Sequence, residues 1–187
     1  MPSTHFTGAT GRAAPLTDDE TLRARARHHI EQGPVTAGYR GDRQVLLDLL
    51  ARALATELTC MLRYKQHALT AQGLNAESVS AEFDKHAQQA QAHAYAVAAR
   101  IVQLGGLPTL NPWHIAARSH VEYVECATLK DMIRENLVAE RIAIESYRET
   151  IDYIGADDPT TRRLLEEILA VEEQHADELT SLMGRYA

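Results

Sequence analysis

The sequence lacks several features that mark large classes of proteins. Its 187 residues include only two cysteines, Cys60 and Cys126, which argues against a disulfide framework of the secreted type. The opening segment has no apolar signal-peptide core, and no stretch approaches the roughly 20 apolar residues of a membrane span. A formal net charge of −7 is opposite to the basic balance of a typical nucleic-acid binder. These absences predict a cytoplasmic protein without membrane contact, and they argue against DNA binding.

Residues 1–41 differ in composition from the rest of the chain. They are rich in glycine, proline, threonine and alanine, contain no lysine, and carry nearly balanced charges. Thr17 followed by three acidic residues is typical of a helix N-terminus, so a short helix over about 17–31 is expected there. The remainder of this segment is predicted to be an extended N-terminal arm.

Residues 42–187 form a predicted second unit that is helical. No proline occurs between Asp42 and Pro108, and Gly73 divides this run into helices over about 42–72 and 79–104. The second of these should end at the pair Gly105-Gly106. A connection with two prolines follows, with room for a short helix.

Two further long helices are predicted after this connection. Thr128, with Asp131 three residues later, resembles a capping box and opens a helix over about 129–154. Asp158 and Pro159 open the last helix, which Gly184 is expected to stop. Strand signals do not compete, so the fold class is all-α. Two short connections on either side of one long crossover are typical of the ferritin-like four-helix bundle.

Ionisable residues interrupt the apolar face of each long helix. In ILAVEEQHADEL, residues 168–179, Glu172 and His175 share a helical stripe with Ile168 and Leu179. An unpaired buried carboxylate costs several kcal/mol, so a compensating partner is expected. A single such residue would be explained as a carboxylate at the edge of the stripe or a hydrogen-bonded core histidine. The same pattern on four helices at matching depth favours a metal site, whose predicted ligands are Glu57, His93, Glu140, Glu172 and His175.

This set matches the di-iron carboxylate pattern except at one position. That pattern uses one glutamate from each of two helices and Glu-x-x-His from each of the other two. The second helix has Ala90 where the glutamate is expected, and Gln89 is a weak substitute. We therefore expect one metal position to bind more loosely than the other, or only transiently. His86, two turns before His93, is expected to lie outside the ligand set, as a structural residue or along an access route.

Four segments resemble bacterioferritin, a member of the ferritin-like superfamily. They are ELTCMLRY, HAQQAQAHA, NLVAERIAIESY and EILAVEEQHADEL. The resemblance implies that Glu57 and His175 are terminal iron ligands, that Glu172 is a bridge, that His93 and Glu140 are further ligands, and that Tyr64 lies near the iron. Bacterioferritin binds haem through a methionine at the position of Gln91, so no haem is expected here.

Other features resemble Dps-like mini-ferritins. The segments VQLGGLP and GADDPTTRRLLEEILAVEEQH are similar to a subgroup called thioferritin, and the chain ends at Ala187, so no fifth helix is expected. This resemblance implies a homo-oligomer in the form of a 12-subunit shell. The cysteine pair of that subgroup does not match Cys60 and Cys126, and Cys60 is interpreted as a small core residue.

These resemblances imply a ferroxidase that oxidises Fe²⁺ with O₂ or H₂O₂ and stores or detoxifies iron. Tyr64 is the candidate catalytic residue, as an electron donor or a hydrogen-bond partner of an oxygen species; the alternative is a core tyrosine with a satisfied hydroxyl. Three other functions stay open: a DNA-protecting stress protein of the Dps type, a di-metal protein that does not use iron, and a degenerate scaffold without metal.

Overall fold

The computed structural model describes residues 16–73 and 76–186. Within these ranges the chain forms six α-helices and one short 3₁₀ helix and contains no strand. None of these helices combines the length and apolar character that a membrane crossing requires. The chain divides into two compact units between Ala37 and Gly38. The all-α prediction is confirmed.

The first unit contains helix α1 (Asp19–Arg27) and the 3₁₀ helix η1 (Ile30–Gln32). Asp18 caps α1 by accepting a hydrogen bond from the Thr21 backbone N–H at 2.9 Å, and two acidic residues occupy the first turn. The helix is shorter than the predicted 17–31, because the chain turns to an extended conformation at His28. The part of the predicted arm before residue 16 lies outside the described residues.

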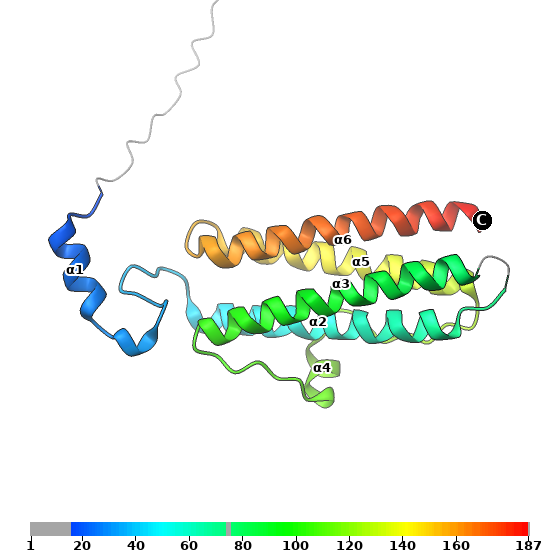
Figure 1. Ribbon diagram of the computed structural model, residues 1–187, viewed down its shortest axis with the longest axis horizontal. Helices are drawn as coiled ribbons and strands as arrows, with labels where there is room; N and C mark the ends of the chain where they lie inside the picture. Colours follow the sequence, from blue (N-terminus) through cyan, green and yellow to red (C-terminus); the bar gives the residue numbers. More distant parts are fainter. Residues whose placement is uncertain (1–15, 74–75, 187) are drawn as a thin grey trace, which may run out of the picture. The chain divides into compact units, whose positions relative to one another are not determined.

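The second unit is built on four long helices, α2 (Arg43–Thr70), α3 (Ala76–Gln103), α5 (Leu129–Ile154) and α6 (Pro159–Arg185). They contain 26 to 28 residues each, which corresponds to about 40 Å of helix. α2 and α3 run antiparallel side by side, as do α5 and α6 (Figure 1). The connection from α3 to α5 runs along the bundle and contains the short helix α4 (Pro112–Arg118) against α2. This is the predicted ferritin-like bundle with one long crossover.

Most helix boundaries coincide with the capping residues that the sequence indicated. Thr128 accepts a hydrogen bond from the Asp131 backbone at the start of α5, and Asp158 accepts one from Thr161 at the start of α6. Gly105 follows α3 with a φ of +77°, a conformation that favours glycine. The prediction that Gly184 stops the last helix was wrong, since α6 continues to Arg185. A glycine with helical φ weakens a helix by only about 1 kcal/mol relative to alanine and need not end it.

A buried ion pair joins the end of α3 to the start of α6. Arg100 donates two hydrogen bonds to Asp158, at 3.0 and 2.9 Å, and a third to the Thr161 hydroxyl at 2.7 Å. Asp158 also receives a hydrogen bond from Tyr39 at 3.1 Å. The Asp158 carboxylate therefore caps α6 and neutralises Arg100 at the same time, which fixes the register of α6 against α3.

Replacing Asp158 with alanine should destabilise the protein by about 3 kcal/mol, because Arg100 would keep a buried charge without a partner. Urea denaturation followed by circular dichroism, at one fixed protein concentration, measures this loss. The control Glu167→Ala removes an exposed ion pair with Arg163 and should change stability by no more than about 0.5 kcal/mol. Equal effects of the two substitutions would contradict the assigned role of Asp158.

Candidate metal centre

Helical spacing brings the predicted ligands together inside the bundle. Glu57 lies on α2, His93 on α3, Glu140 on α5, and Glu172 and His175 on α6. The three glutamates and His175 are at most 3 % exposed, and the His93 side chain is 13 % exposed. All five predicted ligands therefore share one buried region to which each of the four long helices contributes.

One group of ligand atoms consists of Glu57, His93 and Glu172, which lie within 4.8 Å of one another. His93 Nδ1 is 2.8 Å from Glu172 Oε1 and 3.5 Å from Glu57 Oε2. The Tyr147 hydroxyl donates a hydrogen bond to the other oxygen of Glu57. This contact leaves Glu57 Oε2 directed toward His93.

Glu172 connects this group to a second one around Glu140 and His175. Its Oε1 faces His93, whereas its Oε2 lies 3.3 Å from His175 Nδ1. The same His175 nitrogen is 3.5 Å from Glu140 Oε1, which accepts a hydrogen bond from the Tyr64 hydroxyl. Glu172 thus presents one oxygen to each side, the placement that a bridging carboxylate requires.

The structure also reveals neighbours that sequence spacing did not identify. The ring of His86, which is fully buried, stacks on His175 with a centroid distance of 4.0 Å and an interplanar angle of 21°. The expectation that His86 lies outside the ligand set considered only its distance from His93 along α3, whereas across the bundle His86 lies beside the predicted ligand His175. Gln89 accepts a hydrogen bond from His175 Nε2 at 3.0 Å, on the edge of the ring away from the carboxylates. It does not take the place of the carboxylate missing at Ala90.

Burial and mutual repulsion shift the pKa values of the centre. Burial, together with the charges of Glu57 and Glu140, raises the pKa of Glu172 to about 8. Burial opposes a charge on His93, but hydrogen bonds to Glu172 and Glu57 raise its pKa to about 10. Burial likewise opposes a charge on His175, but Glu140 and Glu172 raise its pKa to about 9. Without a metal, these protons neutralise the carboxylates.

The remaining polar groups around the centre stay uncharged. Burial raises the pKa of Tyr64 and of Tyr147 well above the usual value, and Glu140 and Glu57, respectively, add to this effect. Both hydroxyls therefore remain hydrogen-bond donors to carboxylates. Cys60 and Cys126 are free thiols, and burial raises the pKa of the Cys60 thiol well above its usual value. Cys60 is thus a protonated core residue.

The donor set fits a divalent transition metal. Carboxylates and neutral imidazoles are the usual ligands of iron, manganese and zinc. Buried Glu140 Oε2 and His175 Nδ1 have no hydrogen-bond partner, and such atoms normally cost about 1–3 kcal/mol each. A cation between them and their neighbours would satisfy both atoms.

Comparison with known proteins decides the family. Residues 47–187 match the model of the ferritin family, described as the ferritin-like domain. The chain belongs to the ferritin-like family. A solved structure of this type, the dodecameric thioferritin of Bacteroides fragilis, is 30 % identical and superposes with a TM-score of 0.75 over 78 % of this chain and 88 % of that chain.

Curated relatives of this ferritin-like chain carry two kinds of name. The DNA protection during starvation protein of Pyrococcus furiosus is 31 % identical over 72 % of this chain and 74 % of its own length. The bacterioferritin of Rhodobacter capsulatus is 27 % identical over 79 % of this chain and 87 % of its own length. The resemblance to a Dps-like member of the ferritin-like superfamily is confirmed.

Metal binding by this ferritin-like centre should strengthen as pH rises. At pH 7 the raised pKa values leave protons on Glu172, His93 and His175, and a bound metal must displace them. Affinity should therefore increase about tenfold per pH unit for each proton released. Calorimetric titration with Co²⁺ under nitrogen, between about pH 6 and about pH 8 in buffers of different ionisation enthalpy, measures affinity and proton release together. Binding without proton release would contradict the assigned protonation states.

Proposed function

We propose that this protein is a ferroxidase that oxidises Fe²⁺ and stores or detoxifies the resulting iron. The observation that carries the proposal is the convergence of three glutamates and two histidines from four helices on one buried centre. The names of the relatives support it, since they include a bacterioferritin and a thioferritin. Iron is the substrate in this proposal.

The two groups of ligand atoms suggest how two ferrous ions would be held. Glu57, His93 and Glu172 would bind one ion, while Glu140, Glu172 and His175 would bind the other. Two ferrous ions together supply two electrons, which reduce O₂ to H₂O₂ with uptake of two protons, or reduce H₂O₂ to water. Glu172 would hold the ions close together, so that both electrons reach the same oxidant.

Tyr64 has a defined place in this proposal. Its hydroxyl donates a hydrogen bond to Glu140 and so orients one of the proposed ligands. The same contact suits a redox role, because the proton released when a tyrosine loses an electron has an acceptor in Glu140. When only one ferrous ion is present, this electron and the one from iron would together supply the two electrons that reduce O₂ to H₂O₂.

The proposed assembly is a homo-oligomeric shell of 12 subunits around the stored iron. Support comes from the thioferritin of Bacteroides fragilis, which is described as dodecameric and to which 78 % of this chain is similar. The acidic balance of the chain, with its net charge of −7, is suited to attracting ferrous ions to such a shell.

Replacing Glu172 with glutamine should slow Fe²⁺ oxidation by more than about 100-fold, since the variant loses the carboxylate shared by both groups. Stopped-flow absorbance after mixing Fe²⁺ with the protein in air measures the rate. The adjacent Glu173→Gln is the matched control, because Glu173 is exposed and pairs with Arg148 at 2.7 Å. Equal rates in Glu172→Gln and wild type would refute the proposed function.

A DNA-protecting function is the second candidate, because two curated relatives are named for DNA binding or DNA protection. The net charge of −7 makes phosphate contacts unfavourable. We therefore expect no retardation of duplex DNA in a gel-shift assay at low salt, with a basic DNA-binding protein as positive control. Retardation that disappears with added salt would establish the second candidate beside or instead of the first.

A further inference from the structure

Three buried atoms without partners lie in one place. Within the described residues, the buried side-chain nitrogen and oxygen atoms that make no hydrogen bond are His86 Nδ1, Glu140 Oε2 and His175 Nδ1. Their residues come from α3, α5 and α6, and each offers a ligand atom within 4.8 Å of those of the other two. Isolated unsatisfied atoms are rare in protein interiors, so three on neighbouring residues indicate a missing partner. Once His175 releases its proton, these two nitrogens and one oxygen offer lone pairs that a cation would satisfy.

Hydrogen bonds fix the orientation of both imidazole rings. His86 Nε2 lies 2.8 Å from Glu178 Oε2 and 3.3 Å from Glu82 Oε1. Because an ionised carboxylate only accepts, Nε2 carries the hydrogen, and the lone pair of the neutral ring is on Nδ1. His175 is held in the same way, with its Nε2 against Gln89 Oε1. Histidines that bind metals usually donate their second nitrogen to an acceptor in this manner.

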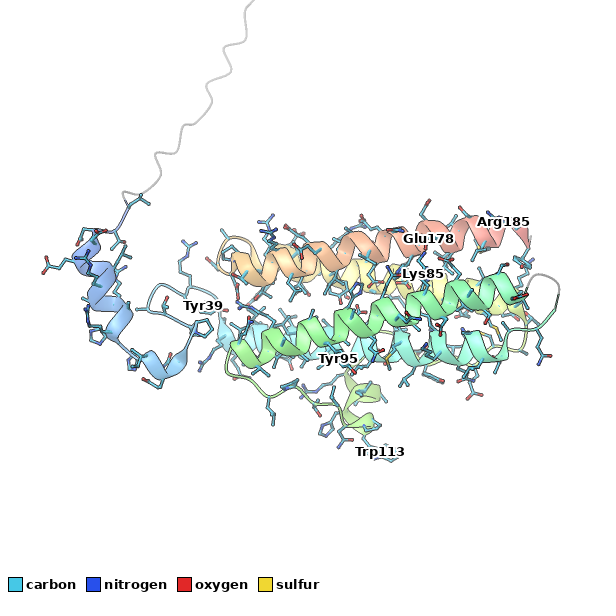
Figure 2. The ribbon with its side chains drawn as sticks, viewed as in Figure 1. Tyr39, Lys85, Tyr95, Trp113, Glu178 and Arg185 are labelled. Carbon is cyan, nitrogen blue, oxygen red and sulfur yellow. The ribbon has the colours of Figure 1, made fainter. Side chains whose placement is uncertain are left out.

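The outer side of His86 is not a second metal site. Glu82, His86 and Glu178 also lie close enough to bind a cation, but Lys85 already occupies this position. Its ammonium group donates to Glu82 at 2.6 Å and to both oxygens of Glu178 at 3.2 and 3.1 Å (Figure 2). Lys85 thus offsets one of the two negative charges of the Glu82 and Glu178 carboxylates, and Glu178 serves to hold His86.

The position of His86 on α3 is related to the missing carboxylate. Ala90, where the di-iron pattern has a glutamate, is buried and offers no ligand atom. His86 lies four residues earlier on the same face of α3, one turn away. The His86 side chain, unlike that of Ala90, carries a ligand atom. It therefore gives α3 a second ligand atom for the centre beside that of His93.

We propose that His86 is a metal ligand, and that it forms with Glu140 and His175 a position of two histidines and one glutamate. This assignment rests on the proposed function, because the position is one half of the proposed iron centre. Two histidines and one carboxylate with open positions suit ferrous iron and similar transition metals. The other position contains Glu57 and His93, and Glu172 faces both positions. The two positions therefore differ by one histidine ligand, so they should bind metal with unequal affinities.

Replacing His86 with phenylalanine tests the assignment, since the ring and its stacking are kept while both nitrogens are lost. The full-length metal-free protein is titrated with Co²⁺ under nitrogen, followed by calorimetry and by the visible absorbance of the bound ion. Wild type should bind two Co²⁺ per chain in two steps of unequal affinity. His86→Phe should lose or strongly weaken one step and keep the other within about threefold.

Controls separate a lost ligand from a damaged fold. His67→Phe makes the same chemical change at an equally buried histidine outside the centre, where the ring bonds Asn136, and should keep both steps. Glu178→Gln leaves His86 in place but weakens its orientation, and should reduce the affinity of the step that His86→Phe removes by about 10–100-fold. Circular dichroism checks that each variant is folded.

The titration tests the ligand role of His86 separately from the proposed function. Two unchanged steps in folded His86→Phe would overturn the ligand role of His86 and leave the proposed function intact. Wild type that binds no Co²⁺ would overturn both. Crystals of wild type grown with Co²⁺ give a test without any variant: an anomalous difference peak should lie about 2.1 Å from a His86 nitrogen. Peaks confined to Glu57, His93 and Glu172 would overturn the assignment.

Discussion

The structure depends on the burial of three carboxyl groups in one small space. Glu57, Glu140 and Glu172 are removed from water at the middle of the bundle, where repulsion between ionised carboxylates is screened only weakly. Such a cluster persists only if cations or hydrogen-bond donors surround it. The chain supplies both, through the tyrosine hydroxyls on Glu57 and Glu140 and the imidazoles on Glu172. The bundle around it is therefore organised to hold positive charge.

The two halves of the centre satisfy this constraint differently. The half around His93 has two carboxylates, whereas the half around His175 has one carboxylate of its own and a neighbouring second histidine. A glutamate at residue 90 would have made the halves more alike, and Ala90 removes that symmetry. For the proposed iron centre, this difference predicts unequal affinities of the two positions.

The fold was largely predictable because its signals are local. Caps such as Thr128 and Asp158 act over three residues, so their effect on a helix start can be judged from the sequence alone. The residues proposed as ligands were identified for a related reason: Glu172 and His175 are three residues apart on one helix face, and equivalent polar interruptions occur on the other helices. Gly184 was misjudged because a glycine only weakens a helix, and packing decides whether it ends there.

What the sequence could not provide was contact between helices. His86 meets His175 across the bundle, and the spacing within α3 carries no information about α6. The Tyr147 hydroxyl likewise donates to Glu57, which is 90 residues away in the sequence. Such pairs follow from the relative register of two helices, which the Arg100–Asp158 pair helps to set.

The high pKa values of His93 and His175 affect how a metal ion binds at the centre. While no metal is present, the protons on these rings offset the negative charge of the carboxylates. The proposed iron centre therefore requires no bound metal for the bundle to fold, unlike small zinc domains that require their metal. Under the proposed function, each ion that binds would displace protons to water, and each ion that leaves would be replaced by protons. Iron could thus enter and leave the centre without unfolding of the bundle.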